Sequence, residues 1–248
     1  MIELINAQKT FNKGTANEIV ALNKVSLTIN ENDFLILLGS NGSGKSTLLN
    51  AIAGSFLLDA GEINIDRVGV TNLEEYKRAK YVSRIFQNPM QGTIPELSIL
   101  ENFRLAALRT KTKVLKIGAD KVFEDLVKSK IETLNMGLEN KVNQNIELLS
   151  GGQRQALTLL MSVMDSTKVL LLDEPTAALD PRSSEMVMQT AQTIITNNKL
   201  TTILVTHRLK DAIDFGNRLM FMKEGNVDKD ITSVSKSEIT LQRLSSWF

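Results

Sequence analysis

Apolar positions along this chain follow patterns that belong to two kinds of β-strand. Residues 34–38, 169–172 and 202–205 form short, mostly apolar runs, which is typical of strands buried on both faces of a parallel sheet. Residues 2–7 and 21–29 are also strand-like, the second with mostly alternating apolar positions, and a polar turn separates them. They indicate an antiparallel layer at the amino terminus.

The pattern becomes helical in residues 92–165. Ser98 and Glu101 form a capping-box signature before a predicted helix at 102–108. A second helix is predicted at 121–134, where apolar residues recur at helical spacing. These apolar residues are Val122, Leu126, Ile131 and Leu134. We interpret the stretch as a helical subdomain inserted into the sheet domain.

The length and hydrophobic content favour one domain. With 248 residues and 42% hydrophobic content, the chain can bury a full core. We expect residues 1–91 and 166–248 to form the core with its β layer, and residues 92–165 to form the helical subdomain. Gly225 has the character of a hairpin turn, and residues 237–248 are expected to form a closing helix. The apolar residues of that helix are Ile239, Leu241, Leu244 and Trp247.

The composition argues against several classes of function. Lys plus Arg number 29 and Asp plus Glu 28, so the net charge of +1 provides no basic field for binding nucleic acid. No apolar run approaches the about 18 to 20 residues that span a bilayer, and the amino terminus lacks the pattern of a secretory signal. We therefore expect a cytoplasmic chain. The absence of cysteine excludes disulfides, thiolate metal sites and cysteine nucleophiles.

Residues 39–47 match the phosphate-loop pattern G-x-x-x-x-G-K-[ST], between the strand at 34–38 and a predicted helix at 46–53. Glycines in this loop let the backbone take positive φ and bring N–H groups around a phosphate. Lys45 supplies charge to the β and γ oxygens, and the Ser46 hydroxyl can ligate Mg²⁺. A simple flexible turn is the alternative, which the flanking strand and helix disfavour. The loop comprises Gly39, Ser40, Asn41, Gly42, Ser43, Gly44, Lys45, Ser46 and Thr47.

A second candidate anion site is Leu-Ser-Gly-Gly-Gln at residues 149–153, which we name the signature segment. It precedes a predicted helix at 154–164, so Ser150 and the Gly151 and Gly152 amides would lie at a helix N-terminus. Taken alone, a glycine pair before a helix is equally well explained as a turn and cap. The neighbouring motifs decide between these interpretations.

The motifs together resemble one family, the ABC ATPases that serve as ATP-binding subunits of ABC transporters. In order along nearly the whole chain, they are the phosphate loop, Gln87 after the strand-like residues 81–86, the signature segment, Asp173-Glu174, Ala178-Leu-Asp180 and His207. The resemblance implies a phosphate-loop NTPase fold of the ABC type, with a mostly parallel sheet flanked by helices. It also implies a head-to-tail dimer with a second copy or a homologue. In that dimer the γ-phosphate of ATP on one subunit is contacted by the other subunit's signature residues, here Ser150, Gly151, Gly152 and Gln153.

Three polar residues follow the buried strands. Asp173 ends one run and is expected at the carboxyl edge of the sheet, where it can hold Mg²⁺ through the ion's water shell. By resemblance, Glu174 polarises the attacking water, although adjacent acids on a loop are often only solvated. His207 is the only histidine. A lone histidine is more often structural, but this one matches the family residue that bonds the γ-phosphate and orders the water.

Three further assignments depend on the resemblance. The Gln87 amide can reach Mg²⁺ and the water without adding charge, and in the family its loop also touches the membrane partner. Asp180 resembles the acid that links the two nucleotide sites. Phe11 lies where the family places an aromatic ring against adenine, although a core phenylalanine is almost equally expected there.

The segment 87–103 looks most like ATPases of putative tryptophan or tyrosine uptake systems, and more loosely like those of branched-chain amino acid uptake. It predicts the motor of an importer at the cytoplasmic face of the cell membrane, with a separate transmembrane permease and a solute-binding protein. A nontransport ABC ATPase acting on a membrane regulatory complex is the alternative. An ABC ATPase that binds nucleic acid or ribosomes is less expected, because the sequence contains neither a second nucleotide-binding unit nor a long coiled coil.

Overall fold

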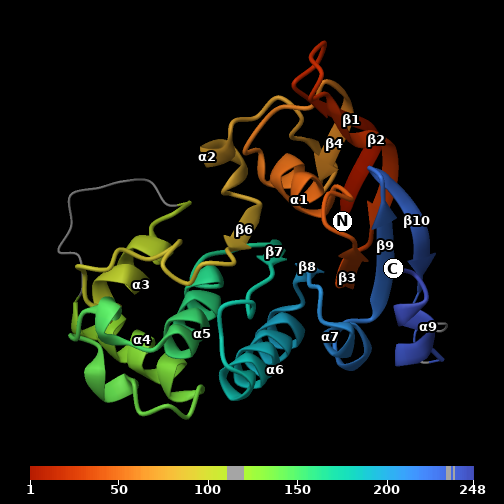
Figure 1. The fold of residues 1–248 in the computed structure, drawn as a ribbon. Helices are drawn as coiled ribbons and strands as arrows, with labels where there is room; N and C mark the ends of the chain where they lie inside the picture. Colours follow the sequence, from red (N-terminus) through yellow and green to blue (C-terminus); the bar gives the residue numbers. More distant parts are fainter. Residues whose placement is uncertain (111–119, 233–235, 237) are drawn as a thin grey trace.

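The computed structural model describes residues 1–110, 120–232, 236 and 238–248. A six-stranded sheet runs through the middle of the molecule (Figure 1). Five of its strands are parallel, and β10 pairs antiparallel with β9 at one edge. In spatial order the strands are β10 (Asn226–Ile231), β9 (Arg218–Lys223), β3 (Phe34–Gly39), β8 (Thr201–Val205), β7 (Val169–Asp173) and β6 (Val82–Ile85).

The central strand β3 explains why the parallel strands are recognisable as continuous apolar runs. Ile36 and Leu38 pack into one hydrophobic cluster, whereas Leu35 and Leu37 pack into another on the opposite face. All four side chains are fully buried. Since successive side chains in a strand point to opposite faces, a strand with two buried faces has no polar alternation. The predicted parallel strands are confirmed.

A second, four-stranded sheet covers one face of the first (Figure 1). Its strands, in order, are β2 (Ile19–Ile29), β1 (Ile2–Phe11), β4 (Ala60–Ile65) and β5 (Val68–Gly69). All its pairings are antiparallel, and the pairing of β1 with β2 is the antiparallel layer that the sequence pattern predicts. The strand predicted at 2–7 continues to Phe11, because β1 pairs with β2 as far as Phe11 through a series of register shifts. The sequence analysis did not predict β4 and β5.

The helices lie on both faces of the parallel sheet. Helix α1 packs in the cluster that faces the antiparallel sheet, and α5 and α6 pack in the opposite one. Figure 1 shows α3, α4 and α5 grouped to one side, in the segment where a helical subdomain is predicted. The helices are α1 (Lys45–Ala53), α2 (Glu75–Arg78), α3 (Ile99–Ala107), α4 (Lys121–Glu132), α5 (Gly151–Ser162), α6 (Pro181–Asn198), α7 (Leu209–Asp214) and α9 (Leu241–Ser245), with 3-10 turns at Glu139–Lys141 and Ile146–Leu148.

The predicted capping box is confirmed, but two helices begin earlier than expected. Ser98 caps α3 directly, because its hydroxyl accepts the Glu101 N–H while the Glu101 carboxylate accepts the Ser98 N–H. The helix therefore begins at Ile99 and not at 102. In the same way, α5 begins at Gly151 and not at 154.

Helix α4 buries only part of the set of residues that the sequence analysis selected. Val122 is 79% exposed and Leu126 47% exposed, so neither belongs to the core. Ile131 is buried as predicted, together with Val127, and Leu134 beyond the helix packs partly buried against the core. The error arises because both sets of positions have helical spacing, and only the packing partners decide which set lies inside.

The tail forms a shorter helix than predicted. Helix α9 covers only Leu241–Ser245, and residue 237 lies outside the described part. Leu244 is fully buried, but Leu241, predicted to be apolar core, is 53% exposed. Trp247 packs edge-on against Phe221 with ring centroids 5.7 Å apart. Among the residues that the structure describes, no helix is long and apolar enough to cross a membrane.

Candidate functional site

The phosphate loop connects β3 to α1, as predicted. Lys45 is the first residue of α1, and its Nζ donates to the carbonyl oxygens of Gly39 at 2.7 Å and Ser40 at 2.9 Å. Burial lowers the pKa of Lys45, and the charges of Glu174 and Asp173 oppose that shift. The Lys45 ammonium group therefore lies in the electrostatic field of two acids that are distant from it in the sequence.

The loop has the features of a phosphate cradle. Gly39, Gly42 and Gly44 have φ of 150°, 79° and 101°, as the sequence analysis predicts. Ser43 Oγ is buried and has no hydrogen-bond partner among the described residues. Free backbone N–H groups at the start of α1, the helix dipole and an unpaired hydroxyl all suit an anion. The residues present therefore fit the phosphates of a nucleotide.

The acids and the histidine meet at the carboxyl edge of the parallel sheet. Asp173 is the last residue of β7, and Glu174 follows it with φ of 46° while its N–H donates to Val205 O at 3.0 Å. His207 lies just beyond β8, and its Nδ1 is 3.1 Å from Glu174 Oε2. The side chain of His207 is 61% exposed and that of Glu174 is 23% exposed. The pair is thus open to a ligand placed above the sheet edge.

The three residues predicted to hold a metal all offer oxygen atoms. Ser46 is exposed on the first turn of α1, Gln87 is exposed just after β6, and the side chain of Asp173 is 16% exposed. Hydroxyl, amide and carboxylate oxygens are the ligands that Mg²⁺ prefers. The described residues contain no cluster of three or more His, Cys, Asp or Glu side chains that could hold a metal by themselves. These three oxygen donors suit a Mg²⁺ ion whose remaining ligands are phosphate oxygens and water.

Arg84 on β6 belongs to this edge and was missed by the sequence analysis. Its Nη2 donates to Asp173 Oδ2 at 2.7 Å and its Nη1 donates to Asn50 Oδ1 on α1 at 2.5 Å. Its guanidinium also lies 4.8 Å from the ring centroid of Phe86. The available signal was a lone cation inside a short apolar strand, which requires a partner on a neighbouring element.

The signature segment lies at the start of α5. The Ser150 hydroxyl accepts the Gln153 N–H, and the Gln153 side chain accepts the Ser150 N–H at 3.1 Å. This confirms the expected cap, with Gly151 and Gly152 in the first turn. Figure 1 shows α5 beside α3 and α4, on the other side of the sheet from α1. Within one chain the structure does not group the signature segment with Lys45.

The two remaining predicted residues have local contacts. Asp180 is the N-cap of α6 and accepts the backbone N–H groups of Arg182 and Ser183. Hydrogen bonds from Ser183 lower the pKa of Asp180. Phe11 is 36% exposed at the end of β1, so it is not a core residue. Its ring meets Phe56 edge-on, with centroids 5.5 Å apart.

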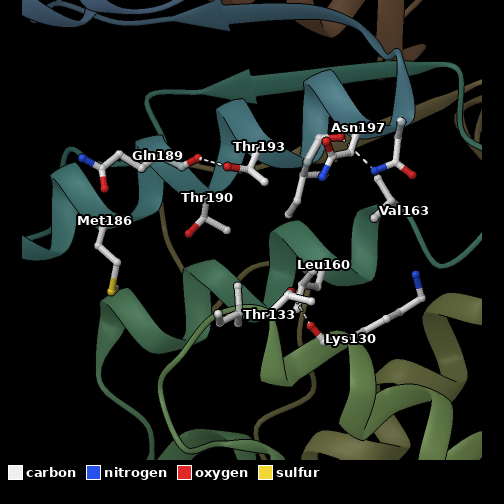
Figure 2. Close-up of a pocket in the computed structure, with 12 residues that line it drawn as sticks. Lys130, Thr133, Leu160, Val163, Met186, Gln189, Thr190, Thr193 and Asn197 are labelled. Carbon is white, nitrogen blue, oxygen red and sulfur yellow. Dashed lines mark hydrogen bonds between the residues drawn. The ribbon is translucent and has the colours of Figure 1, made fainter.

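A separate hollow of about 370 Å³ lies between α4, α5 and α6. Figure 2 shows Thr133, Gln189, Thr190 and Thr193 along it, so its lining is rich in hydroxyl and amide groups. None of the predicted site residues lines it. The hollow is therefore distinct from the site at the sheet edge.

Comparison with known proteins agrees with this geometry. Residues 22–177 match the family model described as ABC transporter. The chain belongs to this ABC transporter family. A tyrosine transport ATP-binding protein of Clostridioides difficile (strain R20291) is 38% identical over 248 residues, covering 100% of this chain and 98% of the relative. An uncharacterized ABC transporter ATP-binding protein of Methanocaldococcus jannaschii, MJ0796, is 33% identical over 237 residues, covering 93% of this chain and 96% of the relative.

Solved structures of this ABC family have the same fold. A dimeric post-hydrolysis structure of MJ0796 bound to ADP and Pi aligns with a TM-score of 0.78 and 28% identity, covering 94% of this chain and 99% of that chain. The protein is therefore an ATP-binding subunit of an ABC transporter and an ATPase. The α/β phosphate-loop fold expected from the sequence is confirmed.

Proposed function

We propose that this ATPase energises the import of a small solute, an amino acid, through a separate transmembrane permease. The observation that carries the catalytic part is the 3.1 Å contact between His207 Nδ1 and Glu174 Oε2, beside Asp173 at the end of β7. The contact supports the proposal, because it brings the Glu174 carboxylate and the His207 imidazole together beside Asp173 at one sheet edge, the usual ligand edge of an open α/β sheet.

The proposed roles follow from what each group can do. Lys45 and the loop amides bind the β- and γ-phosphates, and the exposed ring of Phe11 stacks on adenine. Glu174 accepts a proton from the attacking water, and His207 donates a hydrogen bond to the γ-phosphate. Gln87 helps to position that water. Bound Mg²⁺, held by Ser46, Gln87 and Asp173, would neutralise phosphate charge during transfer.

A second copy of the chain, or a homologue, completes the site. In the proposed dimer, Ser150, Gly151, Gly152 and Gln153 of one subunit contact the γ-phosphate bound by the other, and Asp180 links the two sites. The N-terminus of α5 supports this arrangement, because its positive dipole end favours an anion and its N-cap Ser150 is exposed. The dimeric structure of MJ0796 supports it too. Closing and reopening of the dimer would switch the permease between two states.

The solute assignment depends on likeness to a named relative. The tyrosine transport ATP-binding protein aligns with 100% of this chain and with 98% of its own length, and the segment after Gln87 resembles aromatic amino acid systems. We therefore propose import of an aromatic amino acid, with a solute-binding protein in the complex. The chain would lie at the cytoplasmic face of the membrane, attached through the permease. A motor subunit does not touch the solute, so its own residues carry no direct record of it.

The catalytic proposal is tested by the mass of purified Glu174→Gln protein with and without Mg-ATP, measured by light scattering after size exclusion. We expect ATP to double the mass while ATP turnover falls to background. Wild-type protein, which hydrolyses the ATP, should return to monomer. If Glu174→Gln turns over ATP at the wild-type rate, Glu174 is not the base.

The solute proposal needs the whole complex. The permease that co-purifies with this subunit is reconstituted with it in proteoliposomes containing ATP, and uptake of labelled tyrosine, tryptophan and leucine is compared. We expect tyrosine or tryptophan uptake that disappears with the Glu174→Gln subunit. Uptake of leucine alone would replace the aromatic assignment with a branched-chain one. A partner with a single membrane span and no uptake would support the nontransport alternative.

A further inference from the structure

Arg84 is an unusual residue for its position. It lies inside the short strand β6, and its side chain is only 14% exposed. In the register of β6 and β7 it pairs with Leu171, two positions before Asp173 on the same strand. Since every second side chain of a strand points to the same face, Leu171 and Asp173 share a face with Arg84. That face is the one covered by α1, because Leu171 packs in the cluster that contains the α1 residues.

The guanidinium joins three parts of the nucleotide site. It bonds Asp173 at the end of β7 at 2.7 Å and Asn50 on α1, the helix that follows the phosphate loop, at 2.5 Å. It also lies against Phe86, the residue directly before Gln87. An arginine with two directed donors in one plane fixes a carboxylate more firmly than a lysine does.

We propose that Arg84 is a positioning residue that holds the Asp173 carboxylate by Oδ2 in the orientation that binds the metal of the nucleotide site. The inference depends on the proposed Mg²⁺ site. Partners that orient a metal ligand from behind typically contribute about 10- to 100-fold in metal affinity. The arginine has two opposing effects on the metal. Its hydrogen bond fixes the carboxylate, whereas its positive charge repels a cation, and the proposal requires the first effect to be the larger.

The test is the affinity for a fluorescent ATP analogue, measured across a Mg²⁺ titration and again in EDTA. In EDTA, Arg84→Met should bind the analogue with an affinity within about twofold of wild type, because the phosphate loop itself is not changed. Mg²⁺ should raise the affinity of both proteins, but the Mg²⁺ concentration that gives half of this increase should be about 10-fold higher in Arg84→Met. Arg84→Lys keeps the charge but can reach only one partner, so its half-maximal Mg²⁺ concentration should lie between those of wild type and Arg84→Met. The steady-state ATPase rate should show the same Mg²⁺ shift, with partial recovery at saturating Mg²⁺.

Two control experiments separate the possible outcomes. Arg104→Met removes an arginine that stacks on Phe123 in the helical region and should leave the Mg²⁺ dependence unchanged. In an Asp173→Asn background, Arg84→Met should have no further effect, since the arginine acts through Asp173. An unchanged or lower Mg²⁺ requirement in Arg84→Met, or an undiminished effect in the Asp173→Asn background, would overturn the inference. If wild type gains no affinity from Mg²⁺, the proposed metal site itself is wrong and the inference falls with it.

Discussion

Gly44 offers the sharpest test of how the phosphate loop is built. An alanine Cβ at this position would lie 2.4 Å from the carbonyl oxygen of Ala21 on β2. That strand cannot move freely, because the N–H of Asn23 bonds Gly225 O and the N–H of Gly225 bonds Ser43 O. With φ of +101°, the backbone strain of a non-glycine residue adds about 1–2 kcal/mol. The overlap adds about 1–3 kcal/mol.

Gly42 is the matched control within the same loop. Its φ is +79°, but a Cβ there would meet nothing within 4 Å. Gly42→Ala should therefore lose only the strain term of about 1–2 kcal/mol, whereas Gly44→Ala should lose about 2–5 kcal/mol in total. Urea unfolding of the two variants, followed by circular dichroism, measures the difference. Equal losses of unfolding free energy would show that the close approach to β2 does not constrain the loop.

Three further predictions concern binding, assembly and stability. Lys45→Ala should weaken ATP binding by about 10- to 100-fold, the value of a charged hydrogen bond, whereas His207→Ala should keep ATP binding and lose turnover. Calorimetry measures the binding and an ATPase assay measures the turnover. Full ATPase activity of His207→Ala would remove the histidine from the mechanism. Ser150→Arg should leave ATP binding to the monomer unchanged but prevent the mass doubling expected of Glu174→Gln, and an equal loss of monomer affinity would place the signature segment within one subunit. Arg78 is fully buried and donates to four carbonyl oxygens, so Arg78→Met should lower the unfolding free energy by about 3 kcal/mol or more, and a thermal midpoint equal to wild type would contradict this.

The local sequence pattern was sufficient to predict an element where both of its faces are buried, or where its cap lies within four consecutive residues. The strands β3, β7 and β8 fall in this group because each is apolar on both faces. The capping box at Ser98 falls in it because donor and acceptor lie three positions apart. The box at Ser150 has the same spacing, but the sequence analysis predicted only a helix N-terminus there. The phosphate loop was placed at a helix start by its motif and not by a cap, since Gly44, the N-cap of α1, has no side chain that could form one.

Prediction failed where a partner distant in sequence decides the outcome. Helix α6 is an exception, because it was not predicted although local signals were present. Asp180 followed by Pro181 is a cap signal, and the buried residues Val187, Met188, Ala191, Ile194 and Ile195 recur at helical spacing. The choice between the Val122 and Val127 faces of α4 depends on packing against other elements. The role of Arg84 depends on Asp173, which lies 89 residues away and becomes its neighbour only when β6 and β7 pair.

The turn after β7 shows how the sheet supplies two acids with different surroundings from adjacent residues. Strand pleating places Asp173 on the α1 face, where Arg84 and Lys45 compensate its charge. Glu174 leaves the strand with φ of 46°, a conformation that costs a non-glycine residue about 1–3 kcal/mol. Its N–H still bonds Val205 O, so the residue stays beside β8 and its carboxylate reaches His207. In a regular strand the side chain after Asp173 would point to the face opposite α1. The strained turn instead keeps the Glu174 carboxylate beside His207 at the sheet edge, where we propose that it acts as the base while Asp173 serves the metal.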